Sequence, residues 1–165
     1  MQNVVQNSNV TKINNDGMVV VSGSSVFPNL MPENAPLQMY KEKHSLVPDL
    51  NPIYLPDERV VRIMLKWWLA RKRTVGFGIF GPTRVGKTDL VRYICAKLNW
   101  PLQIVSCHDE IQPYQLEGSR SLVDGEQGVV SDFDYSAIAI AAREGHCLLL
   151  DEVDKLPAAA TAKLH

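Results

Sequence analysis

Two stretches of the chain carry residue types and spacings that could do chemistry. The first, "GPTRVGKT" at residues 81–88, is rich in glycine and ends in a lysine and a hydroxyl side chain. The second, "HCLLLDE" at residues 146–152, is an apolar run that ends in two neighbouring acids. Glycine-rich turns direct backbone N–H groups inward and bind phosphate. Paired carboxylates can hold a cation and polarise a water molecule. Together the two stretches predict chemistry at a phosphate group.

The glycine-rich stretch matches the phosphate-loop pattern G-x-x-x-x-G-K-[ST] in the context that this pattern requires. A β-prone run at residues 74–80 precedes it, and an amphipathic helical pattern at residues 87–99 follows it. We expect Lys87 to reach the β- and γ-phosphates of a nucleotide and Thr88 to offer its hydroxyl to Mg²⁺. The residues expected to bind the nucleotide are Gly81, Pro82, Thr83, Arg84, Val85, Gly86, Lys87 and Thr88.

The acid pair, Asp151 and Glu152, resembles the Walker B element that accompanies such a loop further along a chain. We expect Asp151 to hold Mg²⁺ through water, near Thr88. We expect Glu152 to activate the attacking water as a general base. Lys87 and Glu152 are therefore the candidate catalytic residues, and Thr88 and Asp151 are the candidate metal ligands. The alternative interpretation of the acid pair is a solvated acidic turn.

The periodicity around these stretches predicts strands that alternate with helices, which favours an α/β fold with a parallel sheet. Apolar residues at helical spacing predict a helix over residues 57–73, with Asp57 as its N-cap. The other expected elements are strands at 74–80, at 101–107 and within 143–152, helices at 87–99 and 134–144, and a hairpin about Asp124-Gly125. The last strand is a continuous apolar run, so we expect it to be buried on both faces.

The first part of the chain differs in composition from the rest. Residues 1–40 are polar and predict an extension that is either loosely ordered or a hairpin with its turn at Asp16-Gly17. Residues 47–58 contain three prolines and predict an extended, ordered connector. We therefore expect the folded catalytic region to occupy residues 41–165.

Composition and charge argue against several classes of protein. The net charge is -1, and residues 74–165 carry 8 Lys and Arg against 12 Asp and Glu, so a general nucleic-acid binder is not expected. No apolar run reaches the ~18 residues that a membrane span needs. The three cysteines are an odd number and favour reduced thiols in a cytoplasmic protein.

A metal site made of Cys107-His108 and His146-Cys147 is not expected, although these residue types bind metals. The first pair follows the end of one predicted strand, and the second pair starts another. In parallel neighbours these are opposite ends, separated by several residues at ~3.3 Å each. Four such ligands cannot meet at one ion.

Taken together, these motifs resemble AAA+ ATPases, and within them the MoxR branch with the CobS-like ATPase subunit of aerobic cobaltochelatase and its phage-encoded relatives. The matching stretches within residues 46–156 are "VPDLNPIYLPDE", "KLNWPLQIVS", "YQLEGSRSLVDGEQ" and "AREGHCLLLDEVDK". The resemblance implies a three-layer P-loop NTPase core, ATP and Mg²⁺ as ligands, and a ring of copies, hexameric at full length, that remodels an unknown protein client. The family loop usually has Gly where this chain has Arg84, so the backbone there loses a permissive residue.

The resemblance also implies parts of the site that residues 1–165 do not include. Family members continue with two further strands, a polar sensor residue, arginines from a neighbouring subunit and a small helical lid. We therefore expect a chain truncated after the strand that ends at Asp151-Glu152. It would be the N-terminal part of a longer ATPase and inactive by itself.

Two alternatives to an ATP-driven remodelling subunit stay open. The first is a module that binds nucleotide without hydrolysing it, such as a truncated product or an assembly adaptor. The second is a small P-loop kinase or GTPase, which is disfavoured because the N-K-x-D guanine signature is absent from the sequence. The acid pair also suits activation of water better than transfer to an acceptor.

Overall fold

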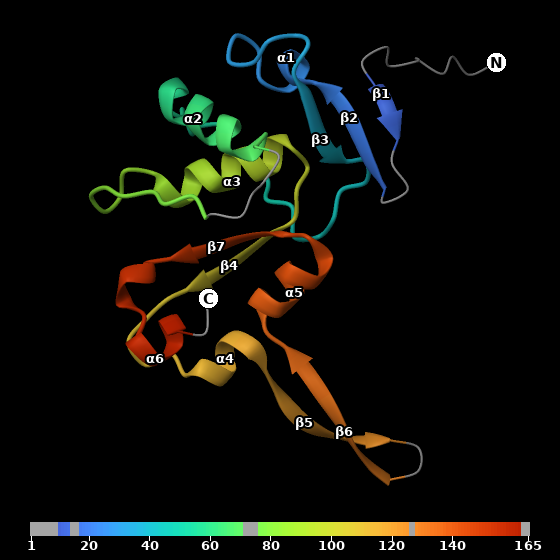
Figure 1. Ribbon diagram of the computed structural model, residues 1–165, viewed down its shortest axis with the longest axis vertical. Helices are drawn as coiled ribbons and strands as arrows, with labels where there is room; N and C mark the ends of the chain where they lie inside the picture. The colour runs from blue at the N-terminus through green and yellow to red at the C-terminus, as the bar shows by residue number, and fades with distance from the viewer. Residues whose placement is uncertain (1–9, 14–16, 71–75, 126–127, 163–165) are drawn as a thin grey trace, which may run out of the picture. The chain divides into compact units, whose positions relative to one another are not determined.

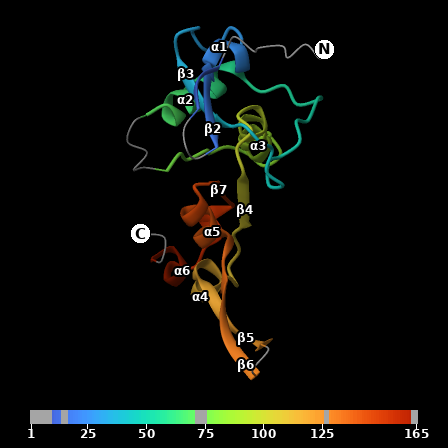
Figure 2. The ribbon, with the colours of Figure 1, turned by 90° about the vertical axis from the view of Figure 1, so that its right-hand side faces the viewer.

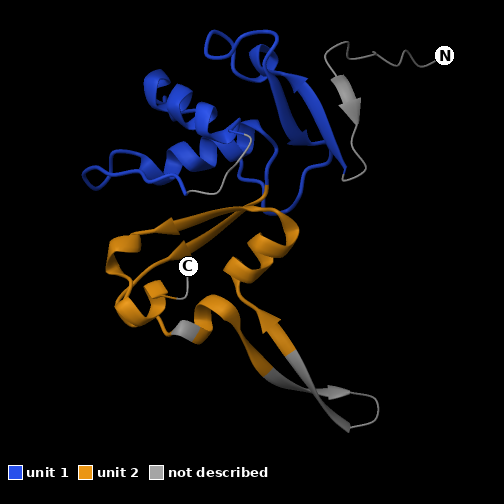
Figure 3. Cartoon of the chain, viewed as in Figure 1, with its two compact units in different colours: residues 1–100 blue, residues 101–165 orange. Residues whose placement is uncertain are grey.

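The computed structural model describes residues 10–13, 17–70, 76–125 and 128–162 of the chain. It divides into two compact units, residues 1–100 and residues 101–165, which Figure 3 shows in different colours. The phosphate-loop stretch belongs to unit 1 and the acid pair to unit 2. Within the described ranges, no helix combines the length and the apolar content that crossing a membrane requires.

Unit 1 begins with a three-stranded antiparallel sheet in the order β1-β2-β3 (Figure 1). Its strands are β1 (Val10–Ile13), β2 (Met18–Ser22) and β3 (Pro36–Tyr40), and the short helix α1 (Gly23–Val26) follows β2. Gly17, before β2, has a φ of 71°, which glycine adopts without strain. Of the two alternatives predicted for residues 1–40, strands β1 and β2 form the hairpin, and residues 14–16 between them lie outside the described residues. The third strand was not predicted.

Helix α2 (Glu58–Trp68) begins where the sequence predicts, because Asp57 caps it. Asp57 Oδ1 accepts a hydrogen bond from the backbone N–H of Arg59 at 2.8 Å, which satisfies one of the donors at the helix start. The apolar stripe of the helix packs into unit 1, and its buried residues are Val61, Met64, Leu65 and Trp68. Residues 71–73 of the predicted helix lie outside the described residues.

Helix α3 (Lys87–Lys97) also forms as predicted, and the "LNWP" stretch after it joins it to the rest of unit 1. Asn99 Nδ2 donates to Tyr40 O at 2.6 Å and to Glu42 O at 3.0 Å. The Trp100 ring packs edge-on against the rings of Tyr40 and Trp68, with centroid distances of 5.0 and 5.3 Å. The end of α3 is therefore tied to β3 and to α2, which fixes the helix that carries the phosphate loop.

The strand predicted at residues 74–80 is wrong for the part that the structure describes. Residues 76–80 are unpaired, and the Phe80 side chain is 91% exposed. A β-strand persists only where a neighbour takes up its backbone hydrogen bonds. No described strand pairs with this segment, so its β-prone composition alone does not make it a strand. Residues 74–75 lie outside the described residues.

Unit 2 contains the predicted parallel strands, β4 (Leu102–Ser106) and β7 (Cys147–Asp151). The register aligns Leu102 with Cys147 and Ser106 with Asp151, so both strands end at the edge where Asp151 lies. The expected burial of β7 on both faces is wrong, because its residues are only half-buried. Its only partner among the described strands is β4, which leaves the other edge uncovered by strand pairing. The three-layer arrangement stays a prediction.

The segment between β4 and β7 contains the second predicted hairpin. Its elements are α4 (Pro113–Glu117), β5 (Gly118–Gly125), β6 (Gly128–Tyr135) and α5 (Ala137–Glu144). Strands β5 and β6 pair as a long antiparallel ribbon (Figure 1, Figure 2). Gly125 pairs with Gly128, so the hairpin predicted about Asp124-Gly125 is present, and residues 126–127 between the two strands lie outside the described residues.

Helix α5 begins at Ala137 rather than near residue 134, because Ser136 is its N-cap. Ser136 Oγ accepts from the backbone N–H of Ala139 at 3.1 Å and donates to Leu116 O in α4. Gly145 ends the helix with a φ of 71°, a conformation that glycine favours at this position. Helix α5 contacts both β4 and β7, so it packs on the parallel pair.

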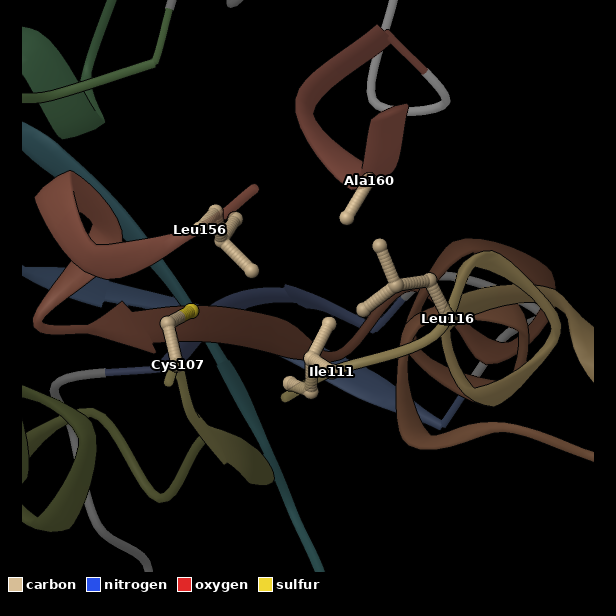
Figure 4. Close-up of a cluster of buried hydrophobic side chains, with 5 residues drawn as sticks. All are labelled: Cys107, Ile111, Leu116, Leu156 and Ala160. Carbon is tan, nitrogen blue, oxygen red and sulfur yellow. The ribbon is translucent and has the colours of Figure 1, made fainter. Parts of the chain in front are cut away.

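A small apolar cluster holds the segment after the acid pair within unit 2 (Figure 4). That segment forms the 3₁₀ turn η1 (Val153–Lys155) and the short helix α6 (Ala158–Thr161). The buried members of the cluster are Cys107, Ile111, Leu116, Leu156 and Ala160. Partly buried Val105 of β4 and Leu150 of β7 pack against them, so the cluster ties the segment to the parallel strands.

Candidate active site

The phosphate-loop stretch turns between residues 76–80 and α3, and three of its residues, Gly81, Arg84 and Gly86, have positive φ. Gly86, the N-cap of α3, has a φ of 83°, and Arg84 has a φ of 62°. Left-handed residues within such a turn direct successive N–H groups to one side, which makes a concave site for an anion. Residues 81–85 are exposed to solvent. The positive φ values and the exposure are compatible with a phosphate-binding loop, and phosphate binding there stays a prediction.

The Lys87 side chain folds back over this loop. Its Nζ donates to Gly81 O at 3.0 Å and to Pro82 O at 2.6 Å. Both partners are neutral carbonyl oxygens, and none of the ion pairs among the described residues involves Lys87. The charge of the Lys87 ammonium is not neutralised by these carbonyl oxygens. A negatively charged phosphate bound in the loop would neutralise it through a charge-assisted hydrogen bond. The residues present thus fit a nucleotide phosphate.

The first turn of α3 adds to the positive character of the loop. Its first internal hydrogen bond runs from the N–H of Leu90 to Gly86 O at 2.9 Å, so the N–H groups of residues 87–89 lie at the N-terminal end. The helix dipole adds partial positive charge there. Thr88 is half-buried in this turn, where a hydroxyl can hold Mg²⁺ beside a bound phosphate. Its role as a metal ligand stays a prediction.

Sequence reasoning missed Tyr54, which lies against the loop from the connector at residues 47–58. The Tyr54 hydroxyl donates to Gly86 O at 3.2 Å. A Cβ built on Gly86 would lie 2.9 Å from Tyr54 Cε2, so the ring occupies the space of a side chain at Gly86. The connector is not extended throughout as predicted, because residues 52–53 form a turn, and only the fold reveals that it touches the loop. A lone tyrosine between prolines was the only available signal.

In unit 2 the acid pair lies where β7 ends. The backbone N–H of Cys107, after β4, donates to Asp151 O at 2.8 Å, which extends the parallel ladder to the last residue of β7. Glu152 then leaves the strand with a φ of 57°. Its Oε2 lies 2.6 Å from Lys155 Nζ, and both side chains are about half exposed, at 55% and 53%. This hydrogen bond, and then the Glu152 charge, raise the pKa of Lys155.

The carboxylates of this edge affect the neighbouring thiol. The pKa of Cys107 is raised, first by burial and then by the negative charges of Asp151 and Asp154. Burial disfavours the thiolate, and nearby carboxylates add repulsion in the same direction. Asp151 and Asp154 thus place negative charge close to Cys107, and Lys155 places a positive charge beside Glu152.

The parallel register explains why the Cys and His pairs do not form one metal site. Cys147 pairs with Leu102 at the start of β4, whereas Cys107 and His108 follow Ser106 at its end. The two pairs thus lie at opposite ends of the parallel strands, as the sequence argument stated. The convergence of the loop in unit 1 and the acid pair in unit 2 on one nucleotide stays a prediction.

The chain is similar in sequence to a known family and to several known proteins. Residues 77–165 match the family model described as AAA domain (dynein-related subfamily). Protein NorQ of Paracoccus denitrificans (strain Pd 1222) is 34% identical over 114 residues, which are 69% of this chain and 40% of NorQ. The aerobic cobaltochelatase subunit CobS of Sinorhizobium sp is 27% identical over 115 residues, which are 70% of this chain and 34% of CobS.

The denitrification regulatory protein NirQ of Stutzerimonas stutzeri is 41% identical over 75 residues, which are 46% of this chain and 26% of NirQ. No solved structure matches the chain. The chain spans well under half of the length of these curated relatives. Both candidate stretches, the phosphate loop and the acid pair, lie within the range of the family model.

Proposed function

Because the chain belongs to the AAA domain family, dynein-related subfamily, and is a MoxR-type AAA+ ATPase sequence, we propose that it binds ATP through residues 81–88. The observation that carries the proposal is the Lys87 ammonium, held by Gly81 O and Pro82 O inside a loop with left-handed residues. In the proposal, the phosphates of ATP take the place of these carbonyl oxygens as partners of Lys87. The first turn of α3 supplies backbone N–H donors to the same phosphates.

In the proposal, hydrolysis depends on Mg²⁺ held by Thr88 and Asp151, since hydroxyl and carboxylate oxygens are its preferred protein ligands. When bound, Mg²⁺ neutralises charge on the phosphate oxygens. Glu152 would act as the general base: its carboxylate would take a proton from a water that attacks the γ-phosphorus, while the bond to the bridging oxygen breaks and ADP leaves. The Lys155 ammonium, 2.6 Å from Glu152 Oε2, occupies one oxygen of this carboxylate and would have to move away as the water approaches.

The proposal extends to the biological setting by family resemblance. Residues 41–165 would form the N-terminal portion of an ATPase domain, and residues 1–40 an extension to it. In a full-length, cytoplasmic ring of copies, ATP hydrolysis would drive the remodelling of a protein client. One relative is a cobaltochelatase subunit, so a chelatase-like role is included. A nucleic-acid or membrane partner is not proposed.

A second function is favoured by one observation. The Glu152 carboxylate already has a partner in Lys155, 2.6 Å away. A module that binds ATP without hydrolysing it, or an assembly adaptor, would use the phosphate loop and leave Glu152 ion-paired with Lys155. Phosphate release by the full-length protein separates the two functions.

A titration with a fluorescent ATP analogue tests the binding proposal on the 165-residue chain. Lys87→Ala removes a charged donor, and hydrogen bonds to charged groups contribute about 1.5–3 kcal/mol, so affinity should fall roughly 10- to 100-fold. Lys66→Ala is the matched control, because Lys66 is an exposed lysine of α2 that lies outside the loop. If the wild type and Lys87→Ala bind the analogue with equal affinity, residues 81–88 are not the ATP-binding loop.

A further inference from the structure

The contact between Tyr54 and Gly86 is not explained by the fold alone. Tyr54 is half-buried, whereas its neighbours Ile53 and Leu55 are 86% and 89% exposed. Tyr54 follows a turn at residues 52–53, and its backbone N–H donates to Asn51 O at 3.3 Å. The connector thus places one tyrosine inward and leaves two large apolar side chains in solvent. The inward residue meets the N-cap of α3, 32 residues further along the chain.

The atom that Tyr54 contacts controls the direction of a backbone donor. Gly86 O accepts two hydrogen bonds, one from the Leu90 N–H at 2.9 Å and one from the Tyr54 hydroxyl at 3.2 Å. A carbonyl oxygen has two lone pairs and can satisfy both. The peptide group is planar and trans, so its C=O and N–H point in opposite directions. Fixing Gly86 O therefore fixes the Lys87 N–H, which points out of the helix N-terminus.

The tyrosine ring supports the same peptide by packing. Its Cε2 would lie 2.9 Å from a Cβ at Gly86, so only glycine allows this approach while it holds a φ of 83°. The Tyr54 ring in turn packs against Tyr93 of α3, with centroids 6.0 Å apart. Burial, then the charge of Asp89, raise the pKa of Tyr54, so its hydroxyl stays protonated and remains a donor near neutral pH.

We infer that Tyr54 is a positioning residue of the nucleotide site: its hydroxyl fixes the peptide between Gly86 and Lys87 so that the Lys87 N–H faces the phosphates of ATP. The inference rests on the proposed function, since it assumes that ATP binds at the loop. It adds a part of the site that lies outside the phosphate-loop pattern. Tyr54 touches only the protein, and it acts through the Gly86 carbonyl.

The test uses the 165-residue chain and the variant Tyr54→Phe, which keeps the ring and removes the hydroxyl. Affinity for a fluorescent ATP analogue should fall about 3- to 10-fold, the range that one neutral hydrogen bond contributes. Tyr93→Phe is the matched control, because it removes a hydroxyl from the neighbouring ring without touching Gly86 O. Its affinity should equal that of the wild type.

A second readout separates positioning from packing. With ¹⁵N-lysine labelling, the Lys87 amide resonance is assigned by its loss in Lys87→Arg and is followed without nucleotide. In Tyr54→Phe this resonance should shift, whereas in Tyr93→Phe it should stay. A shift together with weaker binding supports the inference. Weaker binding without a shift, a shift without weaker binding, or no change in either overturns it.

The same titrations distinguish a failure of the binding proposal from a failure of the role inferred for Tyr54. If the wild-type chain does not bind the ATP analogue at all, the binding proposal fails at that step, and the inference fails with it. If the wild type binds and Lys87→Ala loses affinity while Tyr54→Phe does not, the binding proposal stands. In that case only the role of Tyr54 is overturned.

Discussion

Replacing Arg84 by glycine should make the chain more stable, although it removes a whole side chain. Arg84 has a φ of 62°, at a loop position where the family it resembles usually has Gly. A left-handed conformation costs an L-residue about 1–2 kcal/mol, and glycine adopts it freely. Glycine also makes the unfolded chain more flexible, which costs about 0.4–1 kcal/mol. The net gain is about 0.8 kcal/mol, or about 2–3 °C in melting temperature for a chain of this size.

Two control variants separate the effect of the left-handed backbone at residue 84 from the effect of removing the side chain. Arg84→Ala removes the same charge but keeps a Cβ at the same φ, so it should show no gain. Asn29→Gly changes another left-handed position, with a φ of 64°, and should gain less because asparagine tolerates this conformation. Thermal unfolding followed by circular dichroism measures all three variants. If Arg84→Gly is no more stable than Arg84→Ala, the strain assigned to Arg84 does not exist.

Four further predictions concern unit 2. In the full-length protein, Glu152→Gln should keep ATP binding and lower turnover about 10²–10⁴-fold in a phosphate-release assay; unchanged turnover would place the general base elsewhere. Asp151→Asn should instead weaken only the part of ATP binding that depends on Mg²⁺, measured by titration with and without the ion. Because burial and nearby carboxylates raise the pKa of Cys107, this thiol should resist iodoacetamide at about pH 8 while half-buried Cys147 reacts, as peptide mass spectrometry would show. Because the pKa of Cys107 is higher in the folded state, the thiol stabilises the fold below its ordinary pKa, and this stability is lost as pH rises through the pKa of the folded state. In urea unfolding, the free energy of unfolding of Cys107→Ala should therefore decrease less at alkaline pH than that of the wild type.

Elements specified by local residues were predictable from the sequence. The cap at Asp57 and the apolar stripe after it gave α2, and the phosphate-loop pattern gave the start of α3. The short apolar runs gave the two parallel strands. In each case the determining residues lie within a few positions of one another, where helical spacing and capping act.

Features that depend on a distant partner were not predictable. Residues 76–80 have the composition of a strand, but a strand also needs a neighbour to pair with, and composition does not supply one. The contact of Tyr54 with Gly86 joins residues 32 positions apart, and the bond from Asn99 to Tyr40 joins residues 59 positions apart. Neither pair has a spacing that a helix or a hairpin could reveal. The predicted start of α5, near residue 134, was wrong by a few residues, because Ser136 is the N-cap of the helix.

Backbone strain gives independent support for the two stretches that residue types selected. Among the described residues, the non-glycine residues with positive φ are Asn29, Arg84, Asn99 and Glu152. Asparagine tolerates this conformation, so the strained members are Arg84 and Glu152. One lies in the phosphate loop and the other in the acid pair. Such strain persists only where the surrounding structure enforces it, and it gathers at functional sites. Glu152 lies between the parallel ladder that ends at Asp151 and the buried Leu156 that follows η1. The backbone at Arg84 and at Glu152 thus has an unfavourable left-handed conformation. This is expected if the position of each side chain matters more for function than the local stability that is lost.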